Sequence, residues 1–332
     1  MNFEMHDDAT TTDTNPAQAW PPAGCANGQR RRSASPACSA AAQSAPKWAS
    51  YIAVGDSVTE GLTDPYPGQG EDGEGFDVNN PDLKFRGWAD RLAEALTARR
   101  INNGLEPLQY ANLAIRGRQL GPIIDEQLPA ALEQKPDLIS LVGGGNDILR
   151  PKADIDAIVQ KLENAVITAR EAGADVLLST GFRAGGRLAW TRGRTGQLNS
   201  SIWTIARRHG AYVMDVWGIK SLFDWRMFAD DLIHPNSLGH GRIVNAALIG
   251  LGQPPLAADW DTMLPPEAPL PIDEDSRIPA RLQPKVATLK ENAHWAKDFA
   301  GPWVERRVRG RSSGDGREPK YPTLTPWLAT QF

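Results

Sequence analysis

Short apolar runs alternate with longer amphipathic stretches through the middle of this chain. Apolar runs that end abruptly in glycine or polar residues are typical of buried strands. Because an amphipathic stretch separates each run from the next, the pattern predicts an α/β fold with a five-stranded parallel sheet and helices on both faces. The predicted strands are Tyr51–Val54, Leu108–Ala114, Asp137–Gly143, Asp175–Gly181 and Tyr212–Trp217.

The predicted helices lie between and after these strands. In the clearest of them, Ile155, Ile158 and Leu162 recur at helical spacing and fall on one face. Such a stripe is what a helix buries against a sheet. The predicted helices are Trp88–Arg100, Gln119–Gln134, Asp154–Ala172, Gly196–His209 and Ser237–Ile249.

Two segments flank this alternating body. Met1–Lys47 is rich in small and polar residues with no apolar period, so it cannot bury enough surface to offset its ordering entropy. Beyond the body, the chain is rich in proline up to Pro284, and Lys285–Arg309 again has a helical pattern. The predicted organisation is a disordered arm at residues 1–47, one domain at residues 48–251, and a proline-rich linker with a helical extension at residues 252–332.

The composition excludes several classes of protein. The 332 residues carry a net charge of −4, far from the strongly positive charge of a general nucleic-acid binder. Both cysteines, Cys25 and Cys38, lie in the arm, so the domain has neither a disulfide nor a cysteine-based metal site, and no cofactor or metal is expected. No apolar run approaches the roughly 18 residues of a membrane span. Because no apolar segment follows Arg30–Arg32, as an export signal requires, a cytoplasmic protein is expected.

The stretch Thr63–Asp82 is strongly acidic. It holds six carboxylates and no Lys or Arg. Its Gly68–Gly73 matches the GxGxxG pattern, but no strand precedes it and the carboxylates would repel a pyrophosphate, so dinucleotide binding is excluded. We expect a solvated flap over the site that disfavours anionic substrates, and a cation site is the alternative.

The first predicted strand delivers a serine to the edge of the sheet. It ends in Gly55-Asp56-Ser57, and in parallel sheets of this class the sites form at the carboxyl ends of the strands. A serine is a poor nucleophile until a base and an oxyanion site are brought to it. The rest of the chain must therefore supply a histidine and hydrogen-bond donors at the same edge.

His234 is the best-placed histidine for this role. It follows the last predicted strand and precedes the last predicted helix, so it should share the edge with Ser57. Asp231, three residues earlier on the same turn, can reach the imidazole and hold its tautomer. His209 ends a helix, and His240 lies one turn into the next helix, so structural roles are expected for both.

Two further strand-end loops offer hydrogen-bond donors. Asn112–Gly117 leaves the second strand with a glycine whose backbone N–H can approach a substrate closely. Gly143–Asp147 leaves the third strand and brings the side-chain amide of Asn146. Taken singly, each asparagine could equally be a turn residue. Together with the serine and the histidine, these loops indicate an oxyanion site.

These blocks resemble those of the SGNH hydrolases, the GDSL esterase/lipase family. The resemblance covers about residues 49–250, in the family's order, although Val58 stands where the family name has leucine. It implies a flavodoxin-like three-layer α/β/α sandwich. It also implies Ser57 as nucleophile, His234 as base and Asp231 as its orienting partner, with an oxyanion hole from the Ser57 N–H, the Gly117 N–H and Asn146. The matching blocks are Gly55–Gly61, Asn112–Gly117, Gly144–Asp147 and Asp231–Pro235.

The predicted function is that of a serine esterase acting through an acyl-enzyme on a small-molecule ester, with neutral short-acyl or acetyl esters preferred. Sugar O-deacetylation, thioester hydrolysis and acyl transfer would use the same blocks and stay open. An alternative from another class is a catalytically silent binding module on the same fold. The oligomeric state does not follow from the sequence.

A second serine motif lies in the extension. Gly310–Gly314 (GRSSG) matches the GxSxG elbow of α/β-hydrolases. No strand is predicted before it, and its basic, glycine-rich surroundings are typical of a loop. We therefore predict no nucleophile there.

Overall fold

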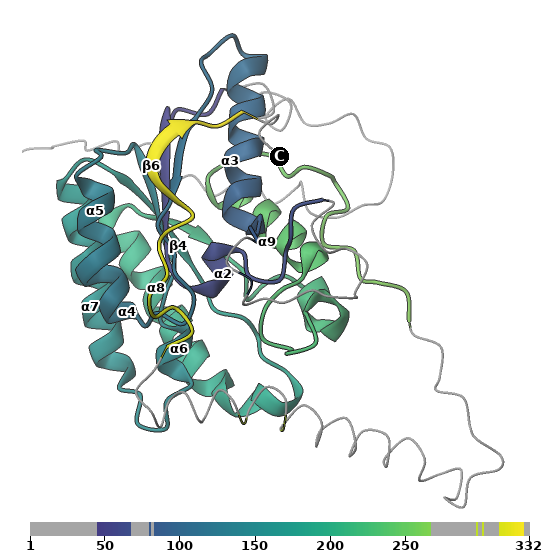
Figure 1. Ribbon diagram of the computed structural model, residues 1–332. Coiled ribbons are helices and arrows are strands. Elements are labelled where there is room, and N and C mark those ends of the chain that lie inside the picture. Colours follow the sequence, from purple (N-terminus) through teal and green to yellow (C-terminus); the bar gives the residue numbers. More distant parts are fainter. Residues whose placement is uncertain are drawn as a thin grey trace, which may run out of the picture.

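The computed structural model describes residues 45–67, 80, 83–266, 297, 301 and 312–328. In this part of the chain one six-stranded sheet has the strand order β5-β4-β3-β1-β2-β6 (Figure 1). Strands β1 to β5 are parallel, as the apolar runs predicted, and β6 is antiparallel to β2. The strands are β1 (Ser50–Val54), β2 (Gln109–Asn112), β3 (Leu138–Leu141), β4 (Asp175–Ser179), β5 (Tyr212–Met214) and β6 (Tyr321–Pro326).

Helices cover both faces of the sheet, which confirms the predicted α/β/α layers. One face is covered by α3 and α9, and the other by the α4–η2–α5 segment, α7 and α8. The helical elements are α2 (Ser57–Glu60), α3 (Gly87–Asn102), α4 (Leu120–Pro122), η2 (Ile123–Gln127), α5 (Leu128–Leu132), α6 (Gly145–Ile148), α7 (Ile155–Glu171), η3 (Gly186–Thr191), α8 (Arg192–His209), η4 (Ser221–Phe223), η5 (Trp225–Met227) and α9 (Ser237–Gly250).

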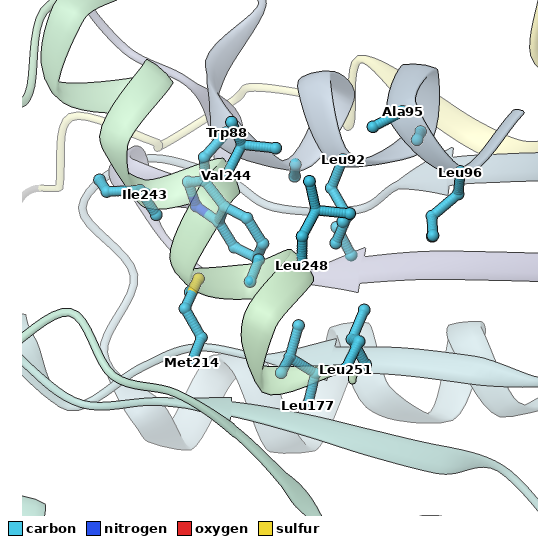
Figure 2. Close-up of a cluster of buried hydrophobic side chains, with 14 of the residues drawn as sticks. Trp88, Leu92, Ala95, Leu96, Leu177, Met214, Ile243, Val244, Leu248 and Leu251 are labelled. Carbon is cyan, nitrogen blue, oxygen red and sulfur yellow. The ribbon is translucent and has the colours of Figure 1, made fainter. Parts of the chain in front are cut away.

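The central strand β1 contributes to both cores because successive side chains of a strand point to opposite faces. Tyr51 and Ala53 lie in the core under α3 and α9, and Ile52 and Val54 lie in the core under α7 and α8. Figure 2 shows the first of these cores, in which Trp88 and neighbouring side chains of α3 meet those of α9 above the sheet. Burial on both faces explains why β1 is a continuous apolar run rather than an alternating one.

The sixth strand is a correction to the five-stranded prediction. Tyr321–Pro326 contains Pro322 and Pro326, which cannot donate to a sheet ladder, so its pattern does not look like that of a strand. As the outermost strand it pairs on one side only, where such residues are tolerated. Trp327, 2% exposed, then packs edge-on against Tyr110 of β2, with ring centroids 4.8 Å apart.

The predicted helix Gln119–Gln134 is broken into three pieces. Its middle, Ile123–Gln127, is a π-helical turn between two short α-helical pieces. Pro129 has no N–H to donate to the preceding turn, which disfavours a regular α-helix at this point. The wider turn ends at the buried Gln127, whose side chain reaches the end of β1.

Several predictions fall on residues outside the described ranges. They concern the disordered arm up to residue 44, the acidic stretch at residues 68–79 and 81–82, and all of the predicted helix at residues 285–309 except residues 297 and 301. Among the described helices, none combines the length and apolar character needed to cross a membrane.

Candidate active site

Ser57 lies at the first position of α2, immediately after β1. Asp56 caps this short helix by accepting a hydrogen bond from the Val58 N–H at 3.1 Å. The turn is tight, since a Cβ on Gly55 would lie 2.5 Å from the Thr59 hydroxyl and 2.8 Å from the Val142 carbonyl oxygen. Only glycine fits there, and the serine is thereby held at the strand end.

Gln127 braces the same strand end, a role that the sequence did not reveal. Its Oε1 accepts from the Gly55 N–H at 2.8 Å, and its Nε2 donates to the Gly55 carbonyl at 3.0 Å. All these groups are buried, so the side chain satisfies the Gly55 N–H and adds a second bond to the Gly55 carbonyl, which also accepts the Ile115 N–H at 3.2 Å. A glutamine within an apolar helical pattern was the only signal.

His234 and Asp231 meet Ser57 at this edge, as predicted. The Nε2 atom of His234 lies 2.9 Å from the Ser57 Oγ, and its Nδ1 lies 2.5 Å from the Asp231 Oδ2. The other carboxylate oxygen, Oδ1, accepts the backbone N–H groups of Ile233 at 2.9 Å and His234 at 3.0 Å. The turn also needs a left-handed backbone at Leu232, with φ of 57°. One carboxylate therefore shapes the loop and orients the imidazole.

The electrostatics of this trio favour a basic imidazole. Burial lowers the pKa of His234, but the negative charge of Asp231 and its hydrogen bond outweigh this, so the pKa lies above its usual value. Burial raises the pKa of Asp231, but the charge of His234 and the hydrogen bonds to it hold that pKa below the usual range. Burial raises the pKa of Asp56 to about 6. Asp231 is therefore ionised at neutral pH and stabilises a proton on His234.

Gly117 and Asn146 border the same cavity as Ser57. Gly117 has a left-handed φ of 73°, and the preceding Arg116 is held by Glu60, whose Oε2 accepts the Arg116 backbone N–H at 2.7 Å. The Asn146 Nδ2 donates to the Arg118 carbonyl at 3.0 Å and, over 3.3 Å, to the Asp56 Oδ2. The structure thus places both predicted donors on the wall of the cavity that Ser57 borders, and the Asn146 amide makes one long bond there.

The alternative residues take other places. Asn112 is fully buried and donates to the Thr59 carbonyl at 3.0 Å, which agrees with a structural role. His240 is fully buried under α3, where its Nδ1 accepts the Trp88 N–H at 3.1 Å. His209 contacts Glu163 at 2.8 Å on the far end of α8.

The cavity at Ser57 has a volume of about 1090 Å³. Its walls are mainly apolar and come from the ends of β3, β4 and β5 and from the loops after them. Of the four aromatic residues in the stretch 217–228, Phe223, Trp225 and Phe228 border the cavity, and Trp217 does not. The described residues include no group of three or more His, Cys, Asp or Glu that could hold a metal ion.

Two further wall residues were not expected. Ser312 and Ser313, from the dismissed GxSxG motif, also line this cavity. No local sequence pattern indicated that these two serines line the cavity, because their position depends on where β6 lies at the edge of the sheet.

Comparisons with known proteins give a family match and several similar folds. A model of the GDSL-like lipase/acylhydrolase family matches residues 53–242. Among solved structures, a variant of Axe2, an acetyl xylan esterase from Geobacillus stearothermophilus, shares 20% identity over 65% of this chain and 99% of its own, with a TM-score of 0.51. An α/β-hydrolase enzyme from the metagenome of Lake Arreo, Spain, shares 23% identity over 64% and 98%, with a TM-score of 0.49. Among curated proteins no sequence matches.

Proposed function

Because the chain belongs to the GDSL-like lipase/acylhydrolase family, we propose that this ester hydrolase works through a covalent acyl-enzyme on Ser57. The observation that carries the proposal is the hydrogen-bonded row from the Ser57 Oγ through both ring nitrogens of His234 to Asp231, at 2.9 and 2.5 Å. The row opens into a cavity large enough for a substrate. Such a row is the arrangement that activates a serine.

In the first half of the reaction, the Ser57 Oγ attacks the acyl carbon while the His234 Nε2 takes its proton. With Nδ1–H donated to Asp231, the Nε2 atom has a free lone pair for this proton. The resulting imidazolium is stabilised by the carboxylate. The imidazolium then passes the proton to the alcohol oxygen as the ester C–O bond breaks, which leaves an acyl group on Ser57.

In the second half, water repeats these steps on the acyl-enzyme. His234 takes a proton from the water, whose oxygen attacks the acyl carbon. The bond from this carbon to the Ser57 Oγ breaks, and the proton returns to the serine. The acid leaves, and the enzyme is restored.

The negative charge on the tetrahedral intermediate needs donors set in advance. We assign the N–H groups of Ser57 and Gly117 and the side-chain amide of Asn146 to this role. The oxyanion would replace the 3.3 Å bond from Asn146 to Asp56, while the shorter bond to the Arg118 carbonyl keeps the amide in place.

The size of the cavity and its aromatic wall support the proposal that the substrate is a short acyl ester of a bulky alcohol. Its volume of about 1090 Å³ far exceeds the space that an acetyl group needs, so room remains for a large alcohol part. Phe223 and Trp225 are 48% and 60% exposed at its wall, and flat aromatic faces of this kind pack well on sugar rings. An acetylated carbohydrate is therefore the first substrate class to test, with thioester hydrolysis and acyl transfer as the alternatives.

Labelling with a fluorophosphonate tests the nucleophile. The wild-type protein should be labelled on Ser57, and Ser57→Ala should lose both the label and ester hydrolysis with an unchanged circular dichroism spectrum. Ser179→Ala is the matched control, since this serine also lines the cavity but is not assigned to the row. A Ser57→Ala protein with activity within tenfold of wild type would contradict the mechanism, and a wild-type protein that takes no label would favour the binding module.

A substrate panel then separates the remaining candidates. Acetylated sugars, simple alkyl acetates, longer-chain esters and thioesters should be compared by kcat/KM, with and without an acceptor alcohol. The proposal expects the acetylated sugars to rank first and hydrolysis to exceed transfer. If kcat/KM instead rises with the length of the acyl chain, the large cavity binds the acyl chain rather than the alcohol.

A further inference from the structure

The segment Ser312–Trp327 returns from the far end of the chain to the active site. Its second half forms β6 beside β2, and its first half runs along the loop that follows β2. Ser312 and Ser313 line the catalytic cavity. The segment is thus fixed to the sheet at one end, where Figure 1 shows β6 in yellow, and its Ser312 and Ser313 reach the cavity wall at the other.

Two close approaches join this segment to the loop that carries Gly117. A Cβ placed on Gly117 would lie 2.5 Å from the Ser312 Oγ and 2.6 Å from the Ser313 Oγ. A Cβ placed on Gly314 would lie 2.2 Å from the Arg116 carbonyl oxygen and 2.6 Å from Ile115. Such distances are shorter than real contacts, so the two backbones pack together without room for a methyl group.

The turn at the start of the segment is braced internally. The Asp315 carboxylate accepts the Ser312 N–H at 2.8 Å, and the Ser312 Oγ accepts the Gly314 N–H at 3.3 Å. The turn can therefore act as a rigid body against the loop.

Lys320 anchors the segment beneath the site. Its Nζ donates to the carbonyls of Glu60 and Phe85, each at 2.7 Å, and to the Asp90 carboxylate at 2.8 Å. The Asp90 carboxylate is fully buried, so the ammonium also neutralises a charge inside the protein. Glu60 in turn holds Arg116. The same loop is therefore held from one side by Glu60 and from the other by the Ser312–Gly314 turn.

We propose that the Ser312–Gly314 turn is a positioning element of the active site that holds the Gly117 N–H where the oxyanion forms. This rests on the proposed function, because it concerns the donor of that mechanism. An N–H stabilises an oxyanion only at about 2.7–3.1 Å, so a small shift of the loop weakens the transition state and leaves substrate binding nearly unchanged. The residues that act through Gly117 are Ser313 and Gly314.

The test is Gly314→Ala, whose methyl group would push on the Arg116 carbonyl. We expect kcat to fall about 10- to 100-fold, within the range seen when an oxyanion donor is lost, with KM changed less than threefold. The inhibition constant of a trifluoromethyl ketone, whose adduct with the serine carries the same oxyanion, should rise by the same factor as kcat falls. Gly241→Ala in α9 is the control, since its Cβ would meet nothing within 4 Å and its backbone is not left-handed.

Ser313→Ala serves if Gly314→Ala does not fold, because it removes atoms rather than adding them. It should lower kcat three- to tenfold, again without a matching rise in KM. The proposal is overturned if Gly314→Ala keeps kcat within threefold of wild type, loses rate only through KM, or behaves like Gly241→Ala. For a Gly314→Ala protein that does not fold, a Ser313→Ala rate equal to wild type overturns it. Fluorophosphonate labelling of Ser57 in each variant distinguishes these outcomes from a failure of the serine mechanism itself.

Discussion

Replacing Asp231 by asparagine separates its two tasks at the active site. The backbone N–H groups of Ile233 and His234 can still donate to the asparagine oxygen, so the turn should keep its shape. The amide would then face the Nδ1 atom of His234 with an NH₂ group. This favours the tautomer with hydrogen on Nε2, which cannot take the proton of Ser57.

The size of the loss follows from the surroundings of the carboxylate. A buried triad aspartate replaced by asparagine costs about 10⁴-fold in kcat. Asp231 is 17% exposed in its side chain, so water can share the contact with Nδ1 and part of the correct tautomer survives. We therefore expect a loss of about 10³-fold, just short of that limit.

The pH profile gives a second, independent readout. In the proposed mechanism catalysis needs neutral His234, so we expect the rate of the wild type to fall as the pH drops below the raised pKa of this residue. Asp231→Asn removes the charge that raises this pKa, while burial, which lowers it, remains. The acid limb of the residual activity should therefore move to lower pH.

The assay is kcat/KM on a neutral ester between pH 4 and 9 in buffers of constant ionic strength, with the exposed neighbour Asp230→Asn as control. Titrating active sites with the fluorophosphonate corrects for misfolded protein. A loss below tenfold, or an acid limb that stays in place or moves to higher pH, would refute the orienting role of Asp231.

Two further predictions concern the amide and a buried imidazole. Asn146→Ala should lower kcat about 10²–10³-fold with little change in KM, whereas a lower melting temperature with normal kcat in the folded protein would make the residue structural. Burial lowers the pKa of His240 to about 4, so the unfolded chain binds the proton first and the folded state loses stability as the pH falls from about 6.5 to 4. In His240→Asn, whose Oδ1 can still accept the Trp88 N–H, this loss of about 1.4 kcal/mol per pH unit should vanish. Denaturant unfolding of both proteins across this pH range measures the difference between their free energies of unfolding. Taking the difference cancels the opposite trend that Asp56 contributes to both proteins. Parallel curves of stability against pH would show that His240 does not titrate in this range.

The sequence predicted those parts of the site that depend on strand ends. Ser57 and His234 could be assigned to one edge because parallel strands point the same way, so chain order alone decides where their ends meet. Asp231 followed because it shares a turn with the histidine. These inferences needed no contact between distant side chains to be known in advance.

The parts that could not be predicted depend on packing between distant segments. The bond pair from Gln127 to Gly55 requires the π-helical turn, whose backbone differs from the regular helix that the apolar period indicates. The place of Ser313 at the cavity depends on β6, whose prolines conceal its strand character. The anchoring of Lys320 on Asp90 joins residues with no local relation. In each case the position of the residue is stabilised by a tertiary contact between segments that lie far apart in the sequence, so no local pattern reveals it.

The pairing of β6 with β2 also bears on how the protein is made. The two strands lie roughly 200 residues apart in the chain, so the ribosome releases β6 long after the other five strands have emerged. Until then β2 is an unpaired edge whose open N–H and C=O groups can pair with other chains. A nascent chain stalled before residue 312 would already contain Ser57, Asp231 and His234 but would lack the turn against Gly117. The hydrolase should therefore become fully competent only after the ribosome has released the segment Ser312–Trp327.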